Sequence, residues 1–114
     1  MPIVDVVHDG TLSGRTLERL RDALVAVVPE AVECDEEPRV GPLQPGDLDV
    51  RFRVRGPLDV GGLPVCVEVR TKRLAGRVDD VQRRADLVRD RLAGLGAGDV
   101  GVWLVLVDGA WSQT

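Results

Sequence analysis

The sequence contains one pattern twice, and this internal repeat limits the folds that the chain can adopt. The stretches "PIVDVVHDGTLSGR" (residues 2–15) and "PVCVEVRTKRLAGR" (residues 64–77) share a proline, a strand-like run, a turn and a Gly-Arg pair. Corresponding positions stand 62 residues apart throughout. Such a repeat indicates two copies of one supersecondary unit. At 114 residues the chain is a single domain, which the pattern divides into residues 2–63 and 64–114.

A helical pattern follows each Gly-Arg pair. The first helix is expected to begin with Thr16 as its N-cap and to end at Pro29. The second is expected to begin at Asp79 and to end at the glycines of residues 94–98. The two apolar stripes are Leu17, Leu20, Leu24, Val27 and Val28 in the first helix, and Val78, Val81, Ala85, Val88 and Leu92 in the second.

A strand pattern then closes each copy, at residues 48–56 and 100–108. The order is β-α-β twice, so the prediction is an α/β fold with a four-stranded mixed sheet and two helices on one face. In residues 48–56 apolar side chains alternate with Asp49, Arg51, Arg53 and Arg55. The face without helices is therefore expected to be charged. The loop at residues 31–46, which contains the acidic stretch 33–38, is expected to be exposed.

Composition excludes several classes of protein. The net charge of −4 argues against a nucleic-acid binder, whose footprint is usually basic. The apolar runs are too short for a membrane span, and the N-terminus lacks the features of a signal peptide. Cys34 and Cys66 are far apart and His8 is the only histidine, so neither a disulfide framework nor a metal site is indicated. We expect a cytoplasmic protein without a cofactor.

The duplicated pattern resembles the tautomerase superfamily. The proline directly after Met1, the strand, the Gly-Arg turn and the helix all match that family's pattern. The first half is most similar to 4-oxalocrotonate tautomerase, through "LSGRT", "DVR" and the hairpin-like "PLDVGG" at residues 57–62. The duplication in one chain resembles 5-carboxymethyl-2-hydroxymuconate isomerase and macrophage migration inhibitory factor.

This resemblance implies an activity and a site. Once Met1 is removed, Pro2 would be a secondary amine acting as general base, moving a proton alpha to a carbonyl in a small carboxylated enol or keto substrate. Arg15, Arg51 and Arg77 match family positions that bind substrate carboxylates, while Arg70 and Arg73 align less cleanly. Trp111 is expected to form either an apolar wall near Pro2 or a packing contact. The family also implies a homotrimer and no cofactor.

Two other interpretations remain open from the residues. One is a non-catalytic binding or regulatory protein of the same fold that retains Met1, since Pro2 would then be an amide without basicity. The other is a nuclease-like metal site, in which Asp49 and Glu68 precede Arg70 and Lys72 in a loose D…E-x-K arrangement. The second interpretation does not explain the repeat.

Overall fold

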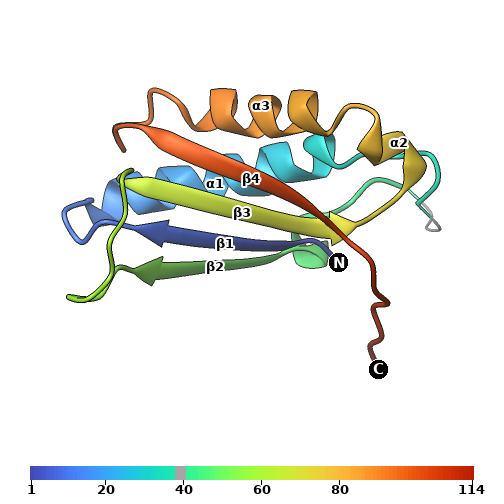
Figure 1. Ribbon diagram of the computed structural model, residues 1–114, viewed down its shortest axis with the longest axis horizontal. Helices are drawn as coiled ribbons and strands as arrows, with labels where there is room; N and C mark the ends of the chain where they lie inside the picture. The colour runs from blue at the N-terminus through green and yellow to red at the C-terminus, as the bar shows by residue number, and fades with distance from the viewer. Residues whose placement is uncertain (38–40) are drawn as a thin grey trace.

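The structure is a computed structural model that describes residues 1–37 and 41–114. Its elements follow the predicted order, strand–helix–strand twice (Figure 1). They are β1 (Ile3–His8), α1 (Gly14–Ala31), the 3₁₀ turn η1 (Pro45–Asp47), β2 (Asp49–Val54), β3 (Val65–Lys72), α2 (Ala75–Val78), α3 (Val81–Leu92) and β4 (Val100–Val107). No helix of the described residues is both long and apolar enough to cross a membrane.

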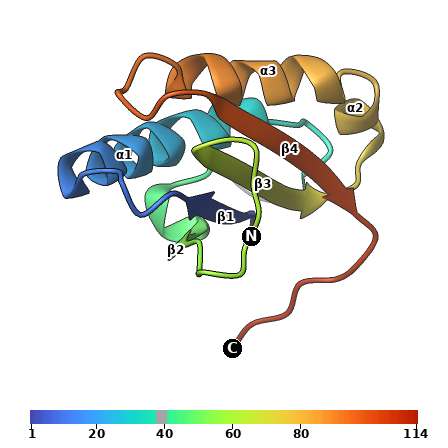
Figure 2. The same cartoon turned by 60° about the vertical axis from the view of Figure 1, so that its left-hand side comes forward.

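The four strands form one mixed sheet in the order β2-β1-β3-β4. The pairs β1–β2 and β3–β4 are parallel, as each β-α-β unit requires, and the antiparallel pair β1–β3 joins the two units. The helices cover one face of the sheet and leave the other open (Figures 1 and 2). This confirms the predicted α/β fold. It also places β1 inside the sheet and leaves β2 and β4 as edge strands.

The core lies between the sheet and the helices. Alternate residues of β1 and β3 point toward the helices, and most of both predicted helical stripes meets them. The most deeply buried of these side chains are Val4, Val6, Leu20, Leu24, Val27, Val28, Val65, Val67, Val69, Val88 and Leu92. Burying a side chain of this size stabilises the fold by about 1.5–3 kcal/mol. The repeat therefore sets both the order of the elements and the faces that they bury.

The predicted ends of the first helix are wrong by a few residues. Ser13, not Thr16, is the N-cap: its hydroxyl accepts a hydrogen bond from the Thr16 N–H at 3.1 Å, and α1 begins at Gly14. The helix also continues past Pro29 to Ala31. Pro29 removes one N–H donor and its ring crowds the carbonyl four residues earlier, and burial of the last turn against the core offsets that cost.

The second helix is divided in two where the sequence predicts one. Asp79 is the C-cap of α2 rather than the start of a continuous helix, and Asp80 precedes α3. The Asp80 carboxylate accepts hydrogen bonds from Arg83 and Arg84 in the first turn of α3. Arg84 is almost fully buried and also donates to three backbone carbonyls, those of Ala31, Glu33 and Gly76. Arg84 thus joins the end of α1 to the start of α3.

Asp80 makes the stability of this junction depend on pH. Its pKa is lowered in the folded protein, mainly by the hydrogen bonds from Arg84 and Arg83. A lowered folded-state pKa stabilises the protein above the ordinary carboxyl value of about 3.9, and the stabilisation is lost as the pH falls through the folded-state pKa. We expect Asp80→Asn to lower the urea midpoint at pH 6, with the gap to wild type narrowing at pH 3. Asp79→Asn, at an exposed position, is the control, and an equal gap at both pH values would contradict this explanation.

Candidate active site

Pro2 lies at the beginning of the central strand β1. It is buried, and its carbonyl accepts a hydrogen bond from the Asp49 N–H at 3.0 Å. On the other side, the antiparallel register pairs Ile3 with Arg70, so Pro2 lies beside the C-terminal end of β3. The residue that the family resemblance marks as a base is therefore held between both neighbours of β1.

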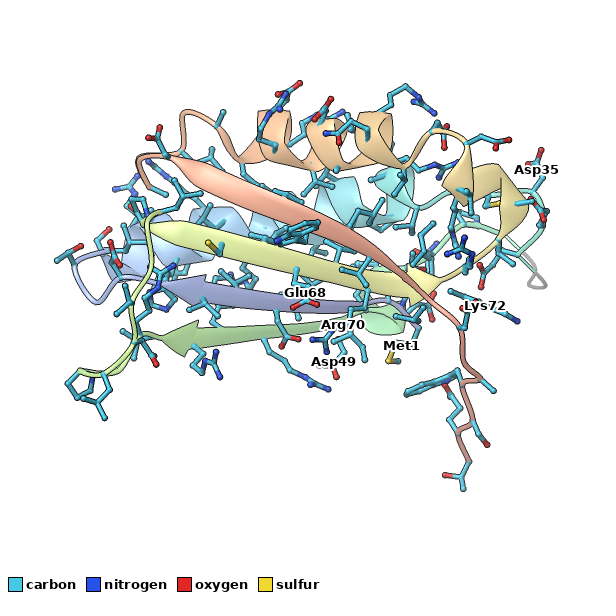
Figure 3. The ribbon with its side chains drawn as sticks, in the orientation of Figure 1. Met1, Asp35, Asp49, Glu68, Arg70 and Lys72 are labelled. Carbon is cyan, nitrogen blue, oxygen red and sulfur yellow. The ribbon has the colours of Figure 1, made fainter. Side chains whose placement is uncertain are left out.

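A hollow of 480 Å³ opens at this end of the sheet. Figure 3 shows Met1 and Lys72 at this end, where the C-terminal tail leaves β4. Met1 is partly exposed in the hollow and is bonded directly to the Pro2 nitrogen. The hollow is lined by Met1, Ile3, Glu37, Arg70, Thr71, Lys72, Val107, Gly109, Ala110 and Trp111. Removal of Met1 would therefore open the Pro2 nitrogen to a space with both charged and apolar walls.

The two cationic side chains of the hollow both come from the end of β3. Arg70 is about half exposed, and its Nε donates to the Glu68 carboxylate at 2.9 Å, with Asp5 at 3.7 Å. Lys72 is exposed at the last position of the strand. In the sequence, Arg70 aligns less cleanly with the family pattern than Arg15, Arg51 and Arg77 do. The missed signal is the antiparallel pairing of the repeats, which brings the end of β3 to the beginning of β1.

Arg51 lies on the open face of β2, beside a second hollow of 330 Å³. Its guanidinium contacts the Asp49 carboxylate at 2.5 Å, and this hydrogen bond raises the pKa of Arg51. Arg70 lines this second hollow as well as the first. Figure 3 shows Asp49, Glu68 and Arg70 gathered on the face without helices. Asp49 and Glu68, the acids of the nuclease-like interpretation, are thus each engaged by an arginine.

Arg15 lies far from Pro2 within one chain. It is in the first turn of α1, which follows the C-terminal end of β1, and its side chain is exposed. The six residues of β1 separate the two ends of the strand by roughly 17 Å. The structure therefore does not bring Arg15 and Pro2 together in a single copy of the chain.

Arg77, the counterpart of Arg15 in the second repeat, is buried with an exposed fraction of 1%. Its Nε donates to the Val32 carbonyl and one terminal nitrogen to the Lys72 carbonyl, both at 2.9 Å. The other terminal nitrogen donates to the Glu37 carboxylate at 2.7 Å. Arg77 thus binds protein groups with all three guanidinium nitrogens.

The acidic loop that Arg77 contacts is largely exposed in its described residues, as expected, but a few of its side chains are held against the protein. Cys34 is buried, and the Glu36 carboxylate accepts a hydrogen bond from the Gly76 N–H at 2.6 Å. Glu37 is only one-fifth exposed. The reason is that Arg77 and Arg84 project from the second repeat and need acceptors, which the loop supplies. Pro38, the last residue of the acidic stretch, lies outside the described residues.

Trp111 lies in the C-terminal tail and lines the hollow together with Met1. The indole is about half exposed, and its Nε1 donates to the side chain of Gln113 at 2.8 Å. Trp111 and Met1 also line an adjoining hollow of 520 Å³. The tryptophan thus supplies apolar surface close to the beginning of β1.

Comparison with known proteins identifies the fold. No protein-family model matches the chain, and no curated protein matches it significantly in sequence. A malonate semialdehyde decarboxylase structure aligns with a TM-score of 0.67 and 16% identity, over 96% of this chain and 88% of the other. A fused 4-OT symmetric trimer aligns with a TM-score of 0.62 and 13% identity, over 92% and 85%. A 5-carboxymethyl-2-hydroxymuconate delta-isomerase aligns with 0.60 and 18%, over 100% and 87%.

At identities this low the likeness is one of fold, and it extends over nearly the whole chain. It covers both β-α-β units, the antiparallel pair that joins them and the helices on one face. The structure of a macrophage migration inhibitory factor-like protein from Entamoeba histolytica aligns over 99% of this chain and 95% of the other, with a TM-score of 0.53 and 11% identity. The chain therefore has the fold of the tautomerase superfamily.

Proposed function

We propose that this protein is a cofactor-independent tautomerase that uses Pro2, freed by removal of Met1, as its general base. The observation that carries the proposal is the position of Pro2, which is buried between Met1 and Ile3, two residues that line a hollow together with Arg70, Lys72 and Trp111. A base, a cationic wall and an apolar wall at one place suit proton transfer alpha to a carbonyl. The neighbouring folds include isomerases and a decarboxylase, which supports an enzyme of this general kind.

The proposed mechanism requires a neutral amine at Pro2. The Arg70 and Lys72 cations and the apolar walls of the hollow disfavour a protonated amine there, whereas the Glu37 carboxylate in the same lining favours it. The amine would take a proton from the carbon or the enol hydroxyl of the substrate and return it at the other site. The cationic wall would hold the substrate carboxylate and stabilise the charge that develops on the oxygen.

Arg70 is the side chain that we expect to hold the substrate carboxylate in this hollow. If it does so equally before and during the reaction, Arg70→Ala will raise KM and leave kcat nearly unchanged. If it stabilises the developing enolate, kcat will fall instead. Arg70→Lys will not restore activity where the substrate carboxylate needs a bidentate contact, because an ammonium lacks the planar guanidinium group that makes one. The measurement is enol-to-keto conversion followed by absorbance.

Arg73→Ala is the matched control, since Arg73 is exposed just beyond β3 and does not line the hollow. An Arg70→Ala variant with wild-type kcat and KM would show that the carboxylate is bound elsewhere.

We further propose that three copies of the chain associate through the open face of the sheet. That face carries exposed Trp103 and the ion pairs of Arg51 and Arg70, and both edge strands are unpaired. One similar structure is a symmetric trimer. Within one chain Arg15 is far from Pro2, so its predicted role in binding the substrate carboxylate requires a neighbouring copy. Arg77 stays within its own chain.

Sedimentation at micromolar concentration is expected to give a species of three chains. Trp103→Asp places a charge on the open face without touching the helix-facing core, and should shift the protein toward smaller species. A stable monomer in the wild-type protein would rule out the trimer.

One observation favours a binding protein as the second candidate function. Met1 itself contributes to the walls of both adjoining hollows. A chain that keeps Met1 would have a ready-made site without a base. Mass spectrometry of the N-terminus distinguishes the two functions, since the enzyme requires a chain that begins with Pro2.

A further inference from the structure

The two adjoining hollows at the beginning of β1 differ in charge. The first carries Arg70 and Lys72 from the end of β3. The second is lined by Met1, Glu37, Gly41, Pro42, Leu43, Gln44, Asp47, Trp111 and Gln113, and among these described residues the charged side chains are acidic. A ligand that spans both hollows would therefore meet cations at one end and carboxylates at the other.

Glu37 stands where the two hollows meet, because it lines both of them together with Met1 and Trp111. Its side chain is one-fifth exposed, so it can contact a ligand while most of it is held by the protein. Asp47, the other acid, accepts a hydrogen bond from the Gln44 N–H at 2.8 Å and is fixed in the η1 turn. Glu37 is therefore the acid placed closest to the walls that surround Pro2.

Arg77 fixes the position of the Glu37 carboxylate. The 2.7 Å contact comes from an arginine whose other nitrogens are bound to the Val32 and Lys72 carbonyls, so the guanidinium has little freedom. An arginine stays protonated at all working pH values. The pair thus fixes the Glu37 carboxylate at the junction through its Oε2. An ionised carboxylate accepts hydrogen bonds and donates none.

We infer that Glu37 determines substrate specificity, selecting a monocarboxylate whose far end carries a hydrogen-bond donor such as a hydroxyl, and rejecting dicarboxylates. This inference rests on the proposed function for the location of the site. The single carboxylate of the substrate lies against Arg70 and Lys72. A second carboxylate at the far end would face the Glu37 carboxylate, where two like charges repel. Arg77 is a positioning residue that acts through Glu37.

The test compares two unreactive ligands of matched length, 6-hydroxyhexanoate and adipate, by calorimetric titration of the protein that begins with Pro2. We expect 6-hydroxyhexanoate to bind at least about tenfold more tightly than adipate. Glu37→Gln should reduce this preference to about twofold or less, because the amide keeps the shape and still accepts from Arg77 but carries no charge. Asp35→Asn is the matched control, since Asp35 is exposed in the same loop and lines neither hollow (Figure 3).

Equal affinities in the wild-type protein, an unchanged preference in Glu37→Gln, or binding of neither ligand would each overturn the inference. The enol-to-keto assay on the same samples separates it from the proposed function. Ligand preference without turnover would count against the tautomerase alone. Turnover of a 2-hydroxydienoate and the corresponding 2-hydroxydienedioate at equal kcat/KM would count against the role of Glu37 alone.

Discussion

Pro2→Ala in a chain freed of Met1 is expected to lower kcat/KM for enol-to-keto conversion by about 10²–10⁴-fold at neutral pH, the range that a positioned general base supplies. The alanine amine is primary and free to rotate, so it is a weaker base than the ring nitrogen of proline and is less well aimed at the substrate. The fold should survive, because the carbonyl that accepts from the Asp49 N–H is retained. The assay follows the loss of enol absorbance, and circular dichroism confirms that the variant is folded.

The chain that retains Met1 is the control for this prediction. Its Pro2 nitrogen is an amide, so it should show the same loss of activity although every side chain of the hollow is present. Full activity in the blocked chain, or in Pro2→Ala, would mean that the base lies elsewhere.

Arg77→Ala is expected to cause the largest loss of stability of any arginine substitution, about 3–5 kcal/mol. The change leaves Glu37 without its partner and removes the hydrogen bonds to the Val32 and Lys72 carbonyls, which lie in different repeats. The loop at 33–37 should detach from α2 as a result. The midpoint and the slope of the urea unfolding curve give the loss in the free energy of unfolding.

Arg73→Ala serves as the control here too, since an exposed substitution of this kind usually changes stability by less than about 0.5 kcal/mol. If the two variants unfold at the same urea concentration, Arg77 is not the contact that holds the repeats together. If Arg77→Ala fails to fold, Arg77→Met keeps much of the buried volume and gives a measurable, smaller loss.

The order of the elements and the buried faces could be predicted from sequence, because they depend on spacing alone. The period-two pattern of residues 48–56 and the stripe that includes Leu20, Leu24 and Val28 are local properties of the chain. The end of α1 could not be predicted in this way. A proline ordinarily ends a helix, and only the core around the last turn explains why this one does not.

The site was harder to predict than the fold. Gly14-Arg15 and Gly76-Arg77 are the same pair in the sequence, yet Arg15 is exposed and Arg77 is almost completely buried. The difference comes from the acidic loop, whose Glu37 contacts Arg77, so it is a property of long-range packing. The place of Arg70 could not be predicted for the same reason: its closeness to Pro2 depends on how the two repeats pair.

The central position of β1 in the sheet affects when Met1 can be removed from the chain. Pro2 is buried only because β2 and β3 flank it, and a ribosome must reach residue 70 before the second of these partners exists. At about 5–20 residues per second, the nascent N-terminus stays unpaired for several seconds. In the finished fold an aminopeptidase would have to reach a bond whose Pro2 side is buried. On the proposed mechanism, the chain acquires its base during synthesis, and a molecule that folds before it is trimmed stays inactive.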